Sequence, residues 1–387
     1  MNIQGIDRPL RIMELRSTYK WGGGPDKTIL NSALMHDPKR IQTLVAYLRS
    51  NWDTEFSIGE KARKMGLHFE EIIESGVIDP KAFKKIIQLI RDNKIDILHS
   101  RDYKTNLYAL IIRTFFCRNI KIVTTAHGWV GSGFKLSLYY TMDKILAASF
   151  DRNFILFKDM VHAFIRKPKP ARTVVIHNAI DPNQWSPDNC EAGKLRKELT
   201  ISEISKIIGF VGRIMPEKDI LTMIDVANEI IHKKNIDAFF VLVGESNDQA
   251  YETEVKNKIT ACNLTERFLC IGKRSELLSV YRDFDIFLMT STQEGFPNSL
   301  LEAMAMKIPS VVSAIDGIPE LIINNENGFL CKPKDIHSFS NAITSLLESP
   351  LLYKKTAAAA RALVETDLSF AMRLKKMETE YERLIDG

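Results

Sequence analysis

The stretch that decides the fold, residues 284–305, reads FDIFLMTSTQEGFPNSLLEAMA. Its first six residues are mostly apolar and are typical of a buried strand in a parallel sheet. Gly295 and Pro297 then interrupt this pattern, and the residues from Leu300 onward strongly favour a helix. The stretch therefore predicts a strand, a tight loop and a helix, which is the repeating unit of α/β folds.

Two glutamates occupy informative positions in this unit. Glu294 falls at the carboxyl end of the predicted strand, where open α/β sheets bind ligands. Glu302 falls in the first turn of the predicted helix, whose free N–H groups form an anion site. One acid could bind sugar hydroxyls and the other a ribose, with the helix start facing a phosphate. Residues 299–302 also fit a capping box, in which Glu302 only accepts a hydrogen bond from the N–H of the cap residue.

The same alternation of apolar runs and amphipathic stretches continues through both halves of the chain. Strands are predicted at residues 10–15, 43–47, 95–99, 121–125, 153–157 and 173–177, and then at 207–211, 238–243, 268–271, 285–289 and 310–313. The polar, turn-rich segment 178–187 separates the two sets, so we predict a domain boundary near residue 186. Residues 370–385 have the pattern of an amphipathic surface helix.

The composition is that of a globular protein of two domains, because the chain has 387 residues, of which 45% are hydrophobic and 26% charged. No apolar run is long enough to span a membrane, and residues 1–9 lack the basic and apolar blocks of a signal peptide. The five cysteines show neither metal-site spacing nor a paired framework. These features predict a protein of the reducing cytoplasm.

The net charge of +5 is unevenly distributed along the chain. Residues 1–185 hold 29 Lys and Arg against 18 Asp and Glu, a net charge of +11, whereas the remainder is net −6. A basic first half indicates an anionic partner, such as a membrane surface at which the protein would bind peripherally, or it is simply a solvated face. Nucleic acid is not expected, because the basic residues alternate with acids and no aromatic-rich binding motif is present.

Two segments of the first half could contribute to a site. Residues 21–26 read WGGGPD, and Gly23 and Gly24 would let the backbone approach a ligand closely. This loop lacks the spacing of a dinucleotide-binding motif. His127, at the end of a predicted strand, could hydrogen-bond a sugar hydroxyl. The following residues 129–134 form a glycine-rich aromatic loop suited to contact with an acceptor.

Three strand ends of the second half carry further candidates. After the strand at 207–211 come Gly212, Arg213 and Lys218, and such a pair of cations can bind phosphate oxygens. Stabilising a departing diphosphate requires this kind of clamp. Gly244 and the pair Lys273 and Arg274 follow the next two strands. Residues 316–320 are interpreted as a tight structural turn.

Residues 294–305 closely resemble the donor-sugar signature of retaining glycosyltransferases of family 4, which pairs two glutamates at this spacing around Gly-Phe-Pro. The segments at 21–26, 125–128, 210–218, 243–245 and 271–274 are similar to the same family. The resemblance implies the α/β fold called GT-B, in which two Rossmann-like doubly wound domains face each other across a cleft. It implies an acceptor-binding domain at residues 1–185 and a donor-binding domain at 186–367, with the helix 368–387 packing back on the first domain.

The same resemblance implies roles for individual residues. It assigns the diphosphate to Arg213 and Lys218, and the donor sugar to His127 and Glu294. The remaining substrate-binding residues that it implies are Gly23, Gly24, Gly212, Gly244, Lys273, Arg274, Gly295, Phe296, Pro297, Asn298, Ser299, Leu300 and Glu302. In the family, the loops at 243–245 and 271–274 hold the nucleotide base mainly through backbone atoms.

The expected function is therefore transfer of a sugar from a nucleotide-diphosphate sugar to a glycan or lipid-linked acceptor, with retention, in cell-surface polysaccharide or glycolipid assembly. The family implies no cofactor and no divalent metal. Two alternatives stay open: a sugar-nucleotide enzyme of the same fold, such as an epimerase, and a non-catalytic sugar-nucleotide-binding protein.

Overall fold

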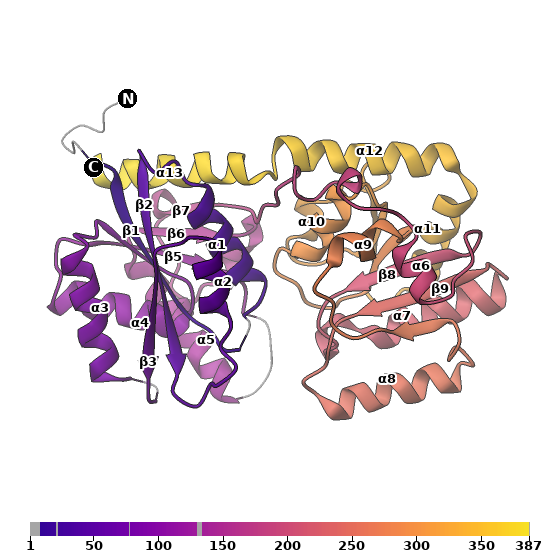
Figure 1. The fold of residues 1–387 in the computed structure, drawn as a ribbon, viewed down its shortest axis with the longest axis horizontal. Helices are drawn as coiled ribbons and strands as arrows, with labels where there is room; N and C mark the ends of the chain where they lie inside the picture. The colour runs from indigo at the N-terminus through magenta and orange to yellow at the C-terminus, as the bar shows by residue number, and fades with distance from the viewer. Residues whose placement is uncertain (1–7, 21, 77, 130–133, 387) are drawn as a thin grey trace. The chain divides into compact units, whose positions relative to one another are not determined.

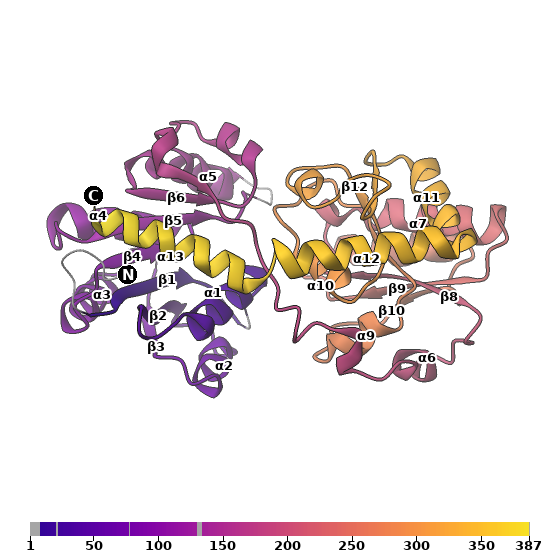
Figure 2. The same ribbon diagram turned by 90° about the horizontal axis from the view of Figure 1, so that it is seen from above.

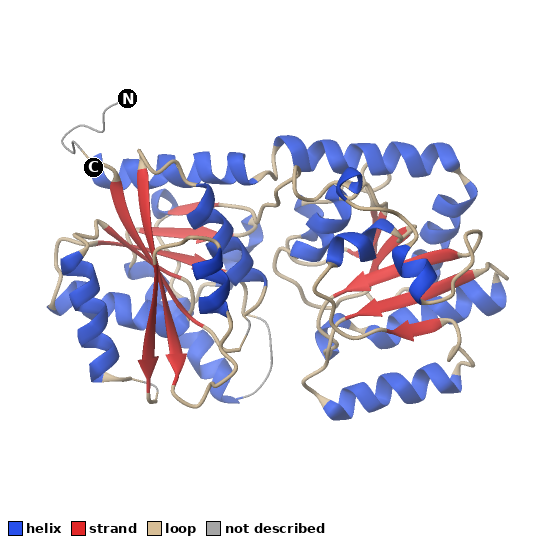
Figure 3. Cartoon of the chain, viewed as in Figure 1, coloured by secondary structure: helices blue, strands red, loops and turns tan. Residues whose placement is uncertain are grey.

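The computed structural model describes residues 8–20, 22–76, 78–129 and 134–386. Contacts divide the chain into two compact units, one made of residues 1–178 and 370–387 and the other of residues 179–369 (Figure 1). Each unit is built around one parallel sheet with helices packed on both of its faces (Figure 3). None of the described helices is both long and apolar enough to cross a bilayer.

The first unit has a seven-stranded sheet in the order β3-β2-β1-β4-β5-β6-β7. Its strands are β1 (Leu10–Ser17), β2 (Ile41–Ser50), β3 (Phe69–Glu74), β4 (Ile97–Ser100), β5 (Lys121–Ala126), β6 (Arg152–Ile155) and β7 (Thr173–Val175). Its helices are α1 (Gly24–Met35), α2 (Ile58–Lys64), α3 (Pro80–Asp92), α4 (Tyr103–Phe115), α5 (Phe134–Leu146) and α13 (Phe370–Asp386). The strand order reverses between β1 and β4, so the carboxyl ends of these strands border a crevice typical of ligand binding.

The last helix, α13, belongs to the core of the first unit and lies across its sheet (Figure 2). Met377, Tyr381 and Leu384 are buried in one apolar cluster with residues of β1, β4, β5 and β6. Glu378 is also buried, and its carboxylate accepts hydrogen bonds from His36 at 2.9 Å and from Arg40 at 2.8 Å. The predicted amphipathic helix therefore buries one face against the sheet and exposes the other.

The second unit has a six-stranded sheet in the order β10-β9-β8-β11-β12-β13. Its strands are β8 (Lys206–Val211), β9 (Ala238–Val243), β10 (Phe268–Cys270), β11 (Ile286–Met289), β12 (Ser310–Ser313) and β13 (Phe329–Cys331). Its helices are α6 (Lys194–Glu198), α7 (Ile220–Asn228), α8 (Gln249–Ala261), α9 (Leu277–Arg282), α10 (Asn298–Ala305), α11 (Ile336–Glu348) and α12 (Pro350–Thr366). Here the order reverses between β8 and β11, which places residues 212–218 and 290–298 at the switch point.

The contacts assign residues 179–185 to the second unit, ahead of the predicted boundary at 186. Arg361 of α12 explains this assignment, because its guanidinium donates to the carbonyl oxygens of Pro182 at 2.8 Å and Trp185 at 2.6 Å. Two strands, β3 and β13, were not predicted. β3 reads FEEIIE, and its three glutamates hide the apolar pattern of a strand.

Candidate functional site

The carboxylate of Glu294 follows β11 and lies next to two donors. Its Oε1 accepts hydrogen bonds from Lys218 Nζ at 2.7 Å and Ser291 Oγ at 2.8 Å. Its backbone N–H donates to Asp316 Oδ2 at 2.7 Å, and the residue is only 9% exposed. Lys218 and Glu294, which the sequence suggested for different parts of a ligand, thus form one ion pair. Asp316, interpreted from sequence as part of a structural turn, orients this pair.

The loop that carries Lys218 is fixed from both sides. Asp219 has a left-handed backbone with φ of 46° and caps α7, accepting from Thr222 Oγ1 at 2.7 Å. Thr290 Oγ1 donates to the carbonyl of Asp219 at 2.9 Å, and the N–H of Thr292 donates to that of Glu217 at 2.8 Å. These bonds hold the loops after β8 and β11 together, so the ion pair is rigidly placed.

Arg213 is an exposed cation at this edge. It follows Gly212 and forms no ion pair with any residue that the structure describes, so its guanidinium is available. Arg274, in contrast, binds Glu198 of α6 at 2.5 Å, so its guanidinium is engaged within the fold. Lys273 beside it is exposed.

The strand ends of β8, β9 and β10 meet through glycine backbones. Gly244 has φ of +154°, and a Cβ there would lie 1.8 Å from the carbonyl oxygen of Gly212. The N–H of Gly212 donates to the carbonyl of Val243 at 2.9 Å, and that of Gly244 donates to the carbonyl of Gly272 at 3.0 Å. This packing explains why glycine is required at 244 and leaves backbone rather than side chains along this part of the edge.

The start of α10 differs from the prediction. The helix begins at Asn298, with Pro297 as the cap residue and no side-chain cap bond, so the proposed capping box is wrong. Proline has no N–H, and Glu302 lies in the second turn rather than the first. Phe296 and Pro297 are buried and Gly295 is partly buried, while the N–H groups of Ser299 and Leu300 have no acceptor inside the helix.

Glu302 is instead a buried acceptor, 4% exposed. Its Oε2 accepts a hydrogen bond from the hydroxyl of Tyr281 at 2.9 Å, and the same hydroxyl lies 3.1 Å from the carbonyl of Ser299. Burial and the neighbouring carboxylate of Glu302 raise the pKa of Tyr281 well above 10. Tyr281 therefore remains a neutral donor that fixes Glu302 beside the start of α10.

In the first unit, Asp26 organises the glycine loop. Its Oδ2 accepts from the N–H of Gly23 at 2.6 Å, and its Oδ1 accepts from Arg16 Nε at 3.0 Å. Gly22 has φ of +71°, and a Cβ there would lie 2.7 Å from the Asp26 carboxylate. Gly24 then begins α1, while Trp21 lies outside the described residues. The loop is therefore wrapped around a buried acid that our sequence analysis did not single out.

His127 follows β5 at the carboxyl edge of the same sheet. Both of its ring nitrogens are buried, and neither has a hydrogen-bond partner among the residues that the structure describes. Burial and the positive charges of Arg16, Arg101 and Arg373 lower its pKa well below 6.5. The ring is therefore neutral, so one of its nitrogens can donate a hydrogen bond and the other can accept one. Residues 130–133 of the expected acceptor loop are outside the described part of the chain.

Beneath His127 lies a buried network that sequence reasoning missed. Arg101 binds both carboxylate oxygens of Glu14 at 2.6 Å and donates to Thr125 Oγ1 at 2.8 Å. His99 contacts Thr125 Oγ1 at 2.8 Å through Nε2 and the hydroxyl of Tyr381 at 2.6 Å through Nδ1. The network therefore joins β1, β4 and β5 to the last helix.

The charges of this network shift its pKa values. Burial alone would raise the pKa of Glu14, but Arg101 and His99 hold it well below its usual range. Burial and Arg101 lower the pKa of His99 to about 4 and that of Arg373, whose guanidinium donates to the carbonyl of His177, to about 9. One signal was available in the sequence: Glu14 interrupts the apolar run at 10–15, and a buried carboxylate requires a cation.

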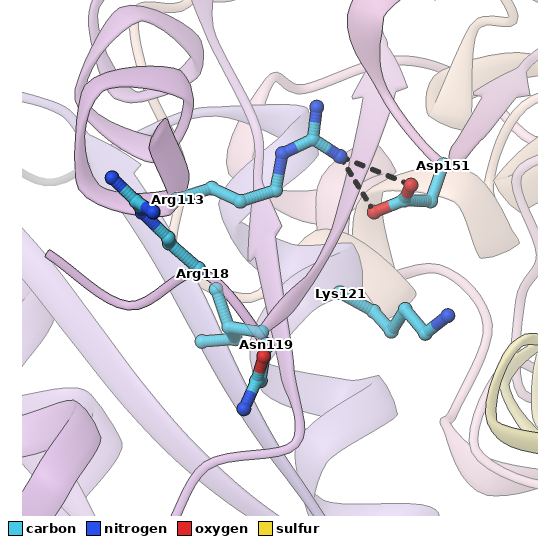
Figure 4. Close-up of a pocket in the computed structure, with 6 residues that line it drawn as sticks. Arg113, Arg118, Asn119, Lys121 and Asp151 are labelled. Atoms are coloured by element: carbon cyan, nitrogen blue, oxygen red, sulfur yellow. Dashed lines mark hydrogen bonds and ion pairs between the residues drawn. The ribbon is translucent and has the colours of Figure 1, made fainter. Parts of the chain in front are cut away.

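A separate hollow lies at the amino ends of β5 and β6, at the opposite edge of the first sheet (Figure 4). Its volume is about 530 Å³, and its lining residues are Arg113, Arg118, Asn119, Ile120, Lys121 and Asp151. Arg113 of α4 binds both carboxylate oxygens of Asp151 at 3.0 Å, so this pair joins the end of α4 to the residue before β6. The hollow is not part of the candidate site.

Comparison with known proteins identifies the family. Residues 192–363 match the family model described as glycosyl transferases group 1, and residues 40–184 match that of glycosyltransferase family 4. The chain belongs to glycosyltransferase family 4. The expectation from the donor-sugar signature is thereby confirmed.

Two named relatives are similar to this glycosyltransferase over most of its length. It is 29% identical over 287 residues to the Escherichia coli UDP-Gal:alpha-D-GlcNAc-diphosphoundecaprenol alpha-1,3-galactosyltransferase, covering 71% of this chain and 72% of that protein. It is 25% identical over 310 residues to the N-acetyl-alpha-D-glucosaminyl L-malate synthase of Bacillus anthracis, and the match covers 78% of this chain and 77% of that protein.

Solved structures support the fold of the glycosyltransferase. Anabaena Alr3699/HepE in complex with UDP-glucose has a TM-score of 0.83 at 20% identity, covering 97% of this chain and 100% of that one. Sucrose-phosphate synthase of Thermosynechococcus elongatus has a TM-score of 0.78 at 18% identity, and the match covers 97% of this chain and 99% of that one. The predicted GT-B class, with two Rossmann-like domains, is confirmed.

Proposed function

We propose that this glycosyltransferase moves a sugar from a nucleotide-diphosphate sugar to a hydroxyl of a glycan or lipid-linked acceptor, with retention of the anomeric configuration. The observation that carries the proposal is the Lys218–Glu294 pair, fixed at the switch point of the second unit beside the start of α10. The names of two relatives, the diphosphoundecaprenol galactosyltransferase and a Staphylococcus aureus capsular polysaccharide glycosyltransferase, favour a role in cell-surface polysaccharide or glycolipid assembly.

The donor diphosphate is the part of the substrate that this edge suits best. Negative charge grows on the leaving diphosphate as its bond to the sugar breaks. Arg213 supplies an exposed planar fork, Lys218 a point charge, and the first turn of α10 its N–H groups. These donors provide positive potential without a divalent cation, so we propose that transfer is metal-independent.

Glu294 and His127 are the proposed contacts of the donor sugar. Glu294 is held by Lys218 and Ser291 through Oε1, and the carboxylate can accept from a sugar hydroxyl. His127 is neutral, so one ring nitrogen can donate and the other accept. Glu302, which Tyr281 fixes, is the proposed contact of the ribose.

We propose attack of the acceptor hydroxyl on the same face of the sugar from which the diphosphate leaves. The bond between the acceptor oxygen and the anomeric carbon forms as the bond from that carbon to the diphosphate oxygen breaks. The acceptor proton passes to the departing diphosphate, so no protein nucleophile is needed. In this account the protein acts at the cytoplasmic side of a membrane, where its basic first domain associates peripherally.

The test is a donor screen followed by analysis of the product. UDP, GDP and ADP sugars are compared by thermal shift, since a ligand at ~100 times its Kd stabilises the folded state by ~2.7 kcal/mol. The stabilising donor is then incubated with acceptors, and the anomeric configuration of the product is read by NMR. An inverted linkage, or donor binding without transfer to any acceptor, contradicts the proposal.

A further inference from the structure

The first sheet exposes a row of large apolar side chains at its carboxyl edge. The loops after β1, β2 and β3 each present one: Tyr19 is 53% exposed, Trp52 67% and Ile78 53%. Ile73, near the end of the edge strand β3, is 59% exposed. We call these four residues the apolar rim.

Hydrogen bonds hold the loops of the apolar rim beside one another. The N–H of Lys20 donates to Asp53 Oδ2 at 2.6 Å, which ties the Tyr19 loop to the Trp52 loop. The N–H of Ser57 donates to the carbonyl of Lys20 at 3.1 Å. The N–H of Asn51 donates to the carbonyl of Glu74 at 2.9 Å, which ties the Trp52 loop to the end of β3. These hydrogen bonds fix the loops of the rim relative to one another. Clusters of exposed apolar groups of this kind mark interaction sites.

Lysines of the following helices border the rim. Lys27 and Lys81 lie in the first turns of α1 and α3 and are exposed, as are Lys84, one turn further on in α3, and Lys61 of the short helix α2. The exposed acids of these segments are Glu55, which pairs with Lys20 at 3.2 Å, and Glu60. The apolar face of α3 does not join the rim, because Ile86, Leu89 and Ile90 are buried in the core.

We propose that the apolar rim docks on the surface of an anionic phospholipid bilayer. Tryptophan and tyrosine prefer the membrane–water interface, and isoleucine the apolar layer beneath it. Lysines around such residues attract anionic headgroups. A glycan-binding platform would need polar partners beside the aromatic rings, and the two isoleucines do not provide them.

This docking rests on the proposed function, and it specifies which side of the first domain meets the membrane. The rim lies at the same edge of the sheet as the glycine loop and His127. Docking by the rim therefore brings the acceptor side of the first domain to the membrane, where the polar head of a lipid-linked acceptor lies.

The experiment uses sedimentation of the full chain with vesicles of phosphatidylcholine, with and without phosphatidylglycerol. Trp52→Ala should weaken partition onto the anionic vesicles about tenfold, since a partly inserted aromatic side chain contributes on the order of 1.4 kcal/mol. The matched control is Phe115→Ala, because Phe115 is 69% exposed and ends α4 at the opposite edge of the sheet. This control should bind as the unmodified protein does.

Equal binding by Trp52→Ala and Phe115→Ala, or loss of binding in both, would overturn the proposal. So would a Trp52→Ala protein that loses affinity for soluble oligosaccharide but binds vesicles normally, because the rim would then be a glycan platform. Turnover of a water-soluble acceptor separates the two proposals. Trp52→Ala should keep that turnover. If the protein has no transferase activity but its vesicle binding still depends on Trp52, the docking surface is supported and the proposed function is rejected.

Discussion

Two ion pairs of similar chemistry occupy the carboxyl edges of the two sheets, yet their surroundings differ. The side chains of Arg101 and Glu14 in the first unit are 0% and 3% exposed and share two hydrogen bonds. Those of Lys218 and Glu294 in the second are 15% and 8% exposed and share one. A closed bidentate pair has little capacity left for a ligand, whereas a lysine bound once can also bind phosphate. The first pair is therefore structural, whereas the second keeps the capacity to bind a ligand.

The largest expected effect is on the stability of the first unit. Arg101→Ala leaves Glu14 buried without its cation and should lower the free energy of unfolding by about 3–5 kcal/mol. The double variant Arg101→Met with Glu14→Gln should recover much of this loss, because no buried charge remains unpaired. Urea unfolding measures both variants. An Arg101→Ala protein as stable as the unmodified one would show that Glu14 does not depend on this pair.

Arg213→Ala should change catalysis and leave folding intact. The exposed guanidinium contributes little to stability, but its loss should lower turnover by about 10²–10³-fold if it stabilises the leaving diphosphate. Lys256→Ala is the control, because Lys256 is an exposed lysine of α8 that pairs with its helix neighbour Glu252. Steady-state kinetics of both variants measure the loss of turnover, and their melting temperatures show whether both are folded. Near-normal turnover by folded Arg213→Ala argues against the clamp.

Acid should weaken the first unit through His99. Its pKa is about 4 in the folded protein and about 6.5 unfolded, so the unfolded chain takes up the proton first. The contribution of neutral His99 is complete above pH 6.5 and is lost as the pH falls from there towards 4. Between pH 6.5 and pH 4, the free energy of unfolding of the unmodified protein should therefore fall by on the order of 2–3 kcal/mol more than that of His99→Gln. Parallel pH profiles of the two proteins would contradict this role.

A smaller effect is expected at Glu302. Glu302→Gln keeps an acceptor for the Tyr281 hydroxyl, so stability should change by less than about 1 kcal/mol. Donor affinity should fall about tenfold if the carboxylate binds ribose. Tyr281→Phe is the matched comparison, because it should cost about 1 kcal/mol of stability by leaving Glu302 short of a donor. Isothermal titration with the donor measures the affinities, and unchanged affinity in Glu302→Gln would remove Glu302 from the site.

No effect at all is expected from removing divalent cations. Turnover in excess EDTA should equal that in added magnesium or manganese, because Arg213, Lys218 and the start of α10 supply the positive potential. Activity that disappears in EDTA and returns only with a metal would show that this account of the leaving group is wrong.

Much of the second unit could be predicted because its signals are local. The apolar run before Glu294 and the glycine breaks after each strand depend on residues close together in the chain. The start of α10 was misplaced because Ser299 and Glu302 have capping-box spacing although Pro297 occupies the cap position. The first unit was harder, since His99 and Tyr381 are far apart in sequence and meet only after the sheet and the last helix have packed.

The packing of α13 also has a consequence for how the chain folds. Tyr381 and Met377 complete an apolar cluster that includes Leu10 and Ile12, and the whole second unit lies between these residues in the sequence. The second unit is one continuous segment, so it can fold from residues 179–369 alone. The first unit must bring together residues that are more than 360 positions apart, and such distant contacts are slow to form. The first unit is therefore complete only after α13, which follows the second unit in the sequence, has docked on its sheet.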